Sequence, residues 1–287
     1  MTVIEAHRLR KRFGTTLALD ALDFHLENGH ILGLVGPNGS GKSSTVNAIL
    51  GLTKYDGQLR VLGYEPWRDR HSLMRDVSFM ADVTVVPSWL RVSQALDYFT
   101  GVHPKFDRKR AEASLSRLNL KHSYRVRELS TGMIAQLQIA LITAINSKLL
   151  VLDDPTANLD FLSRKQFYDS LLDEYLENKP AILIATHQIE EVQHVLTDAI
   201  FLVRGKVAFS CDMDEFSSRY TEVTVRPDAL AEARSLHPIQ ERQFVGRTLL
   251  LFDSVDRMRL ASLGDLQIPT LADVLSAVVS QQSIQTK

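Results

Sequence analysis

The sequence predicts an α/β protein in which a parallel sheet is accompanied by a long helical insertion and followed by a small α+β appendage. Short apolar segments at residues 149–152 and 181–185 are typical of strands buried on both faces of a parallel sheet. Residues 82–146 are mostly helical in their hydrophobic period, which predicts the insertion. Beyond about residue 212, strand-like and helix-like segments mix again, so a second, smaller unit is expected.

Composition places the chain among ordinary globular proteins. Of its 287 residues, 45% are hydrophobic and 23% are charged, which excludes disordered and collagen-like classes. The 33 basic and 34 acidic residues leave a net charge of −1, which excludes a global basic field for nucleic acid but not a local basic patch. No nucleic-acid partner is expected. The longest apolar runs are too short to span a bilayer, and no signal peptide is expected. The single cysteine, Cys211, cannot form an internal disulfide, which favours a reducing cytosol.

The first elements predict a hairpin followed by a strand, a loop and a helix. Residues 3–13 and 17–26 form two strands joined by a turn at Gly14. Residues 30–35 form a short apolar strand that runs into a glycine-rich loop, and a helix begins at Ser43 and ends at Gly51.

The remaining elements divide the chain into two domains. The insertion is expected to hold helices at 92–99, 108–120 and 133–145, and a hairpin is expected at 200–203 and 206–209. In the appendage we expect strands at 222–225 and 242–252 and helices at 229–236 and 271–279, the last opened by a capping box of Thr270 and Asp273. The predicted domains are 1–212, with a helical subdomain at about 83–146, and an accessory domain at 213–287.

The strongest local signal is a loop of the form G-x-x-x-x-G-K-[ST] between a predicted strand and a predicted helix. Its glycines let backbone N–H groups turn inward around phosphate oxygens, and Lys42 brings a positive charge to the β- and γ-phosphates. The Ser43 hydroxyl is placed to bind Mg²⁺, and the helix that follows adds its positive end. The predicted phosphate-binding residues are Gly36, Pro37, Asn38, Gly39, Ser40, Gly41, Lys42, Ser43 and Ser44.

A second motif follows the apolar strand at 149–152. Asp153 emerges at the carboxyl end of this strand, where α/β sheets place ligand sites, and we expect it to bind Mg²⁺. Together with the loop, this motif predicts binding of a nucleoside triphosphate with Mg²⁺.

Between the two motifs, Leu129-Ser130-Thr131-Gly132-Met133 resembles LSGGQ, the signature of the ABC transporter ATPases. Other elements of that family follow in the same order. Phe13 resembles the aromatic residue that stacks on adenine, residues 156–160 resemble the D-loop, and His187 resembles the switch histidine. The resemblance covers roughly residues 1–212.

The resemblance implies a P-loop NTPase core with an antiparallel β-subdomain, and a head-to-tail dimer with a second copy or a paralogous ATPase. Each ATP would lie between the phosphate loop of one subunit and Ser130, Thr131 and Gly132 of the other, with Asn158 and Asp160 at the interface. It also implies ATP hydrolysis coupled to transport, with export favoured. The partner would be a separate transmembrane permease, and the chain would be cytoplasmic, peripheral on the inner face of the cell membrane.

Two catalytic positions depart from the family pattern. Asp154 stands where the family carries the glutamate that acts as general base, so its carboxylate is one methylene shorter. A shift of about 1 Å in a positioned group can cost on the order of 10²-fold, so we expect slow hydrolysis. Asp82 stands near the usual glutamine that senses the γ-phosphate and Mg²⁺. The expected catalytic residues are therefore Asp154, His187 and Asp82, with Asp82 also a metal ligand.

Several alternatives remain open at this level. Phe13 could be a core aromatic, His187 a polar residue at a strand end, and Asp82 a loop residue. The apolar residues Val85, Val86, Trp89 and Leu90 could contact the membrane partner or belong to the core of the insertion. A soluble ABC-type ATPase and a nucleotide-gated scaffold with little turnover are the alternative functions.

Overall fold

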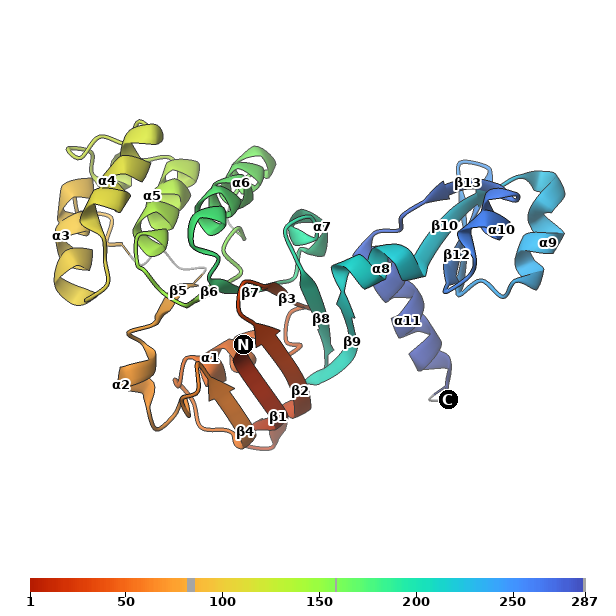
Figure 1. Ribbon diagram of the computed structural model, residues 1–287, viewed down its shortest axis with the longest axis horizontal. Coiled ribbons are helices and arrows are strands. Elements are labelled where there is room, and N and C mark those ends of the chain that lie inside the picture. Colours follow the sequence, from red (N-terminus) through yellow and green to blue (C-terminus); the bar gives the residue numbers. More distant parts are fainter. Residues whose placement is uncertain (82–85, 158, 286–287) are drawn as a thin grey trace. The chain divides into compact units, whose positions relative to one another are not determined.

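The computed structural model describes residues 1–81, 86–157 and 159–285 and divides into two compact units (Figure 1). The first unit comprises 1–196 and 202–207, and the second comprises 197–201 and 208–287. The division therefore passes through strands β8 (Asp198–Val203) and β9 (Lys206–Asp212). The domain boundary after residue 212 stays a prediction.

A six-stranded sheet in the order β5-β6-β7-β3-β8-β9 confirms the predicted α/β class. Strands β3 (Ile31–Val35), β5 (Val77–Ala81), β6 (Leu149–Asp153) and β7 (Ala181–Thr186) pair in parallel. Every residue of β3 and β7 is buried, as expected for strands covered on both faces. Because the strands are parallel, the carboxyl ends of β3, β6 and β7 meet at one edge of the sheet.

A three-stranded antiparallel sheet in the order β2-β1-β4 forms a second layer. It consists of β1 (Thr2–Phe13), β2 (Thr16–Glu27) and β4 (Asp56–Val61). Helix α1 (Lys42–Ile49) contacts β2 of this sheet and also β6 and β7 of the parallel sheet, so it lies between the two. A short helix, α2 (Arg70–Leu73), precedes β5.

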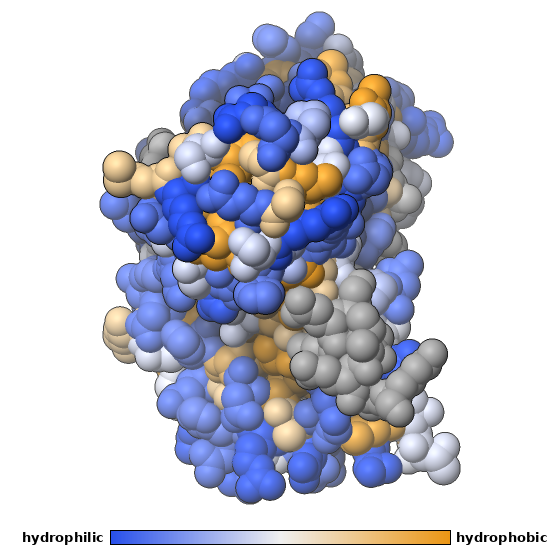
Figure 2. Space-filling model, turned by 90° about the vertical axis from the view of Figure 1, so that its right-hand side faces the viewer, coloured by the Kyte–Doolittle hydropathy of each residue, from blue (hydrophilic) through white to orange (hydrophobic). Residues whose placement is uncertain are grey.

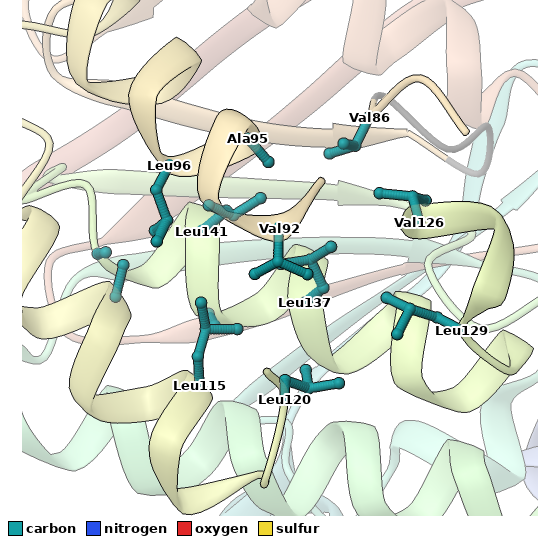
Figure 3. Close-up of a cluster of buried hydrophobic side chains, with 13 residues drawn as sticks. Val86, Val92, Ala95, Leu96, Leu115, Leu120, Val126, Leu129, Leu137 and Leu141 are labelled. Carbon is teal, nitrogen blue, oxygen red and sulfur yellow. The ribbon is translucent and has the colours of Figure 1, made fainter. Parts of the chain in front are cut away.

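The insertion is helical, as predicted, and has its own core (Figure 3). Helices α3 (Val92–Val102), α4 (Arg108–Arg117) and α5 (Thr131–Thr143) pack on one another, and α5 also packs against α6 (Phe161–Asn178). A 3₁₀ turn, Val126–Glu128, leads into α5, and the short helix α7 (Ile189–Val192) contacts α6. The buried core residues are Val86, Val92, Ala95, Leu96, Ala111, Leu115, Leu120, Val126, Leu129, Leu137, Ala140, Leu141 and Ala144.

The second unit is a four-stranded antiparallel sheet in the order β11-β12-β10-β13 with helices around it. The strands are β10 (Tyr220–Val225), β11 (Gln240–Phe244), β12 (Arg247–Asp253) and β13 (Gly264–Gln267). The helices are α8 (Met213–Arg219), α9 (Leu230–Ser235), α10 (Arg257–Ala261) and α11 (Leu271–Gln285), and a 3₁₀ turn, Pro227–Ala229, precedes α9.

The capping box predicted before α11 is present. Thr270 Oγ1 donates to Asp273 Oδ2 at 2.7 Å and accepts from the Asp273 backbone N–H at 3.2 Å. The prediction of one strand at 242–252 is wrong, because β11 and β12 form a hairpin that turns at Val245 and Gly246. Both turn residues have positive φ, at 48° and 75°. Valine is uncommon at positive φ, so the sequence lacks the Asn-Gly or Asp-Gly signal of such turns.

Hydrophilic residues cover most of the face that Figure 2 shows, with apolar residues scattered among them. In the described part of the chain, none of the helices combines the length and the apolar character needed to cross a membrane.

Candidate nucleotide-binding site

The glycine-rich loop joins the buried strand β3 to the start of α1. Gly41 has φ 112°, and a Cβ there would lie 2.9 Å from the Ala18 carbonyl oxygen, so this position requires glycine. The contact also shows that the start of β2 lies against the loop. The tip formed by Pro37, Asn38 and Gly39 is exposed, whereas Ser40 is buried. The loop is therefore tightly folded at its base and open at its tip.

Lys42 is folded back into this loop. Only 5% of it is exposed, and its Nζ donates to the carbonyl oxygens of Gly36 at 2.8 Å and Pro37 at 3.2 Å. Burial lowers the pKa of Lys42, while the nearby carboxylates of Asp154 and Asp153 act in the opposite direction. Phosphate oxygens are stronger acceptors for an ammonium than carbonyl oxygens, so they can replace both loop contacts.

The N-terminus of α1 faces the same loop. Gly41 is its N-cap, and among the described residues no side chain caps this end by a hydrogen bond. Ser43 is exposed and Ser44 is half-buried in the first turn. Backbone N–H groups at an uncapped helix start are ready donors to an anion.

The carboxylates after β6 lie at the same edge of the sheet. Asp153 is the last residue of β6 and pairs with Ala81 of β5 and Ala185 of β7. Asp153 offers carboxylate oxygens and Ser43 a hydroxyl oxygen, the ligand types that Mg²⁺ prefers. The described residues contain no group of three or more His, Cys, Asp or Glu that could hold a metal.

Asp154 is held by His187. The Asp154 backbone has φ 45°, and its N–H donates to the Ala185 carbonyl oxygen at 2.8 Å. Its Oδ1 accepts from the His187 backbone N–H at 3.2 Å and lies 2.9 Å from His187 Nδ1. The structure thus brings the expected base and the expected switch histidine together, with both side chains partly exposed. His187 lies directly after β7 and is paired with Asp154, and its role as the switch histidine stays a prediction.

Phe13 lies at the end of β1 and is 53% exposed, which excludes the reading as a core aromatic. The Lys11 ammonium lies 4.8 Å from the centre of its ring, within cation–π range. The other side of an exposed ring is available for stacking on a base. Because β2 continues directly from this hairpin to the loop contact at Ala18, Phe13 belongs to the same region of the molecule as the phosphate loop.

The segment 130–132 begins α5. Ser130 is the N-cap, and its side chain accepts from the Met133 backbone N–H at 3.2 Å. Ser130 and Thr131 are exposed, and Gly132 is half-buried. A Cβ on Gly132 would lie 2.8 Å from Ser163 Oγ at the start of α6. Asp160 caps that helix, since it accepts from the Ser163 N–H and hydroxyl, and these bonds lower the pKa of Asp160.

The cluster at residues 85–90 is divided between buried and exposed side chains, and its contact with a membrane partner stays a prediction. Val86 is buried in the core of the insertion (Figure 3). Leu90 packs against that core, so these two are core residues. Trp89 is 65% exposed and remains available to a partner. Asp82, Val85 and Asn158 lie outside the described residues.

Two residues near the site carry no signal in the sequence. Arg164 of α6 bonds the carbonyl oxygen of Leu159 and pairs with Glu191 of α7. An arginine and a glutamate on the surface of two helices are ordinary in sequence, and only their tertiary contact singles them out.

Comparison with known sequences assigns the chain to a family. The sequence model described as ABC transporter matches residues 19–157. The chain is 31% identical to the Nod factor export ATP-binding protein I of Cupriavidus pinatubonensis, over 91% of this chain and 83% of that protein. It is 26% identical to the ABC transporter ATP-binding protein YtrB of Bacillus subtilis, over 79% and 77%. It is also 33% identical to the probable multidrug ABC transporter ATP-binding protein YbhF of Escherichia coli, over 76% of this chain but 38% of that protein.

Solved structures agree on the fold. A subunit of the ABC transporter complex cbiONQ from Clostridium perfringens superposes with a TM-score of 0.67 at 21% identity, covering 82% of this chain and 95% of that one. A dimeric bacterial ABC transporter cassette gives 0.64 at 22% identity, covering 73% and 98%. The predicted P-loop core with its antiparallel subdomain is therefore confirmed.

Proposed function

Because the chain belongs to the ABC transporter family, we propose that it binds ATP with Mg²⁺ at residues 36–44 and hydrolyses it to drive transport through a separate permease. The observation that carries this proposal is Lys42, buried inside the loop with the carboxylates after β6 close enough to affect its pKa. A buried ammonium that faces exchangeable carbonyl oxygens is a preformed site for the triphosphate.

The residues of the loop provide binding and orientation. Lys42 exchanges the Gly36 and Pro37 carbonyl oxygens for phosphate oxygens, and the N–H groups of the loop and of α1 complete the cradle. Ser43 and Asp153 would hold Mg²⁺, which supplies charge neutralisation at the β- and γ-phosphates. Phe13 would stack on the adenine, and Asp82 would approach the γ-phosphate.

Asp154 and His187 would orient the attacking water. Water attacks the γ-phosphorus, the bond to the bridging oxygen breaks, and ADP and phosphate form. Asp154 accepts a hydrogen bond or a proton from the water, and His187 positions the γ-phosphate. The short side chain of Asp154, already engaged by His187, supports slow turnover, since the carboxylate must reach the water from further back.

The signature and the D-loop would act across a dimer. The N–H groups at the start of α5, with Ser130, Thr131 and Gly132, form a second anion site that faces outward and would meet the nucleotide of a second copy or of a paralogous ATPase. Asn158 and Asp160 would lie at that interface. A dimeric relative of the same fold supports this arrangement.

Transport is proposed to be export, at the inner face of the cell membrane. The relatives include a Nod factor export protein and a probable multidrug transporter subunit, which supports the direction. The exposed Trp89 on the helical insertion is available for a permease contact. The accessory domain at 213–287 is proposed to regulate or stabilise the dimer.

A nucleotide-gated scaffold with little turnover is the second candidate. The contact between Asp154 and His187 favours it, because a carboxylate that is already engaged by His187 must reach the attacking water from further back. Steady-state phosphate release from the purified chain, with Mg²⁺ and with a chelator, separates the two functions. Turnover that depends on Mg²⁺ and disappears in Lys42→Ala supports the ATPase. ATP binding without measurable turnover supports the scaffold, and the absence of ATP binding contradicts both.

A further inference from the structure

Arg164, in the first turn of α6, makes two contacts that the proposed chemistry does not use. Its Nε donates to the carbonyl oxygen of Leu159 at 2.7 Å, and its Nη1 forms an ion pair with Glu191 Oε1. The side chains of Arg164 and Glu191 are only 23% and 20% exposed. The pair is therefore largely shielded from water, and it differs from a surface ion pair of little consequence.

The two contacts join the segments on either side of the candidate catalytic groups. Leu159 follows Asp154 by five residues in the sequence. Glu191 lies in α7, which begins directly after His187-Gln188. Since His187 holds Asp154, the chain and its contacts form a closed ring from Asp154 through Leu159, Arg164 and Glu191 back to His187. A displacement at His187 is therefore linked to Asp154 directly, and to Leu159 through Glu191 and Arg164.

The chemistry of the link is specific to arginine. The guanidinium offers separate donors, at Nε and Nη1, to a carbonyl oxygen and to a carboxylate. A lysine has a single ammonium and cannot reproduce this fork. The second carboxylate oxygen, Glu191 Oε2, is buried and accepts no hydrogen bond from the residues that the structure describes. The ion pair with Arg164 is thus what compensates the partly buried charge.

The same turn of α6 borders the signature segment. Asp160 bonds Ser163, and Ser163 lies beside Gly132. The first turn of α6 therefore contacts Leu159, Asp160, α7 and the start of α5. These are the segments that the proposed function assigns to the shared nucleotide and the dimer interface.

We propose that Arg164 is a positioning residue that couples the state of His187 to Leu159 and Asp160 and, through them, to the second ATPase subunit. The inference rests on the proposed function. When His187 engages the γ-phosphate, its contact with Asp154 changes, α7 moves with it, and Arg164 carries the displacement to Leu159. Arg164 is not one of the residues proposed to bind the nucleotide or Mg²⁺, so its loss should leave nucleotide binding to the single subunit intact.

The test compares Arg164→Met and Arg164→Lys with Lys165→Met, a matched change at the next, exposed residue of α6. We expect Arg164→Met to lower kcat about 3- to 30-fold, in the range of mutations that alter coupling between sites. KM and the ATP affinity of the monomer should stay unchanged, and the Hill coefficient for ATP should fall toward one. Arg164→Lys should rescue only part of kcat, and Lys165→Met should behave as wild type.

Glu191→Gln provides a second, milder variant, because it weakens the ion pair and leaves the bond to Leu159. Glu191→Gln should also lower kcat with KM unchanged, but by a smaller factor than Arg164→Met. If Arg164→Met does not fold, Glu191→Gln tests the inference in its place. The double variant should be no slower than the slower single variant, since both act on one link.

Three outcomes overturn the inference. In the first, Arg164→Met keeps the kcat and Hill coefficient of Lys165→Met. In the second, the Arg164 and Glu191 variants all lose monomer ATP affinity in step with kcat, which shows a purely structural role. In the third, the effects of the two single variants add fully. A wild-type chain without any turnover contradicts the proposed ATPase instead, so the two failures are distinguishable.

Discussion

The loop 36–44 and the segment 130–132 are proposed to bind the same nucleotide in a dimer, yet they are built differently. The loop is closed on itself, with Lys42 5% exposed and bonded to the Gly36 and Pro37 carbonyl oxygens. The segment 130–132 is open, with Ser130 and Thr131 exposed and one capping bond to Met133. The difference indicates that the loop can hold a triphosphate within one chain, whereas the segment becomes a binding site only when another subunit brings the nucleotide to it.

Substitution at the catalytic pair should have the largest effect. His187→Ala and Asp154→Ala should both be nearly inactive in steady-state phosphate release, because positioned proton transfer contributes roughly 10²–10⁴-fold. Asp154→Glu should be as fast as wild type or faster, since the longer side chain brings the carboxylate nearer to the water. Wild-type turnover in Asp154→Ala would show that Asp154 is not the base.

Lys42→Ala should lower ATP affinity about 100-fold, because charge-assisted hydrogen bonds to phosphate contribute about 1.5–3 kcal/mol each. Calorimetric titration of the monomer measures this, and the circular dichroism spectrum should stay that of the wild type. Lys165→Ala, which removes an exposed charge elsewhere on the same unit, is the control. An unchanged affinity would contradict the assignment of the loop.

Gly132→Asp tests the role of the exposed segment 130–132 in dimerisation. In an Asp154→Asn background, ATP with Mg²⁺ should drive the chain from monomer to dimer in sedimentation, since a ligand favours the state that contacts it twice. Gly132→Asp should abolish this by placing a carboxylate against the γ-phosphate, without changing monomer affinity.

Gly132→Ala is the necessary control, because any Cβ at this position approaches Ser163 Oγ to 2.8 Å. The serine side chain can rotate away, so we expect this variant to keep most of its dimerisation. If the alanine variant fails as completely as the aspartate variant, the effect is steric within one chain.

Truncation after Asp212 should have the smallest effect. It removes α8 and the four-stranded sheet, none of which carries a proposed nucleotide ligand, so ATP affinity should stay within a few-fold. An insoluble product or one that does not bind ATP would make residues 213–287 part of the nucleotide-binding core.

The fold and most of the phosphate loop could be predicted because their signals are local. The apolar segments of β6 and β7 and the glycines before Lys42 determine backbone conformation within a few residues of themselves. The hairpin at Val245 and Gly246 could not be predicted from the sequence. The positive φ of Val245 is imposed by the pairing of β11 with β12, because valine has no propensity for such a turn. The sequence could not decide either whether the apolar residues at 85–90 belong to the core of the insertion or contact the membrane partner. The burial of Val86 and the exposure of Trp89 depend on where α3 and α5 pack.

By itself, the sequence determined the order of the motifs, the residue types at the phosphate loop and the departure at Asp154. Each of these follows from covalent order and local geometry. Only the tertiary structure decided that Asp154 Oδ1 is held by His187 and that Arg164 bridges Leu159 and Glu191. The reason is that these contacts join groups that are far apart in the sequence or carry no local signal in it. They exist because β6, β7, α6 and α7 converge at one edge of the parallel sheet, a placement set by long-range packing.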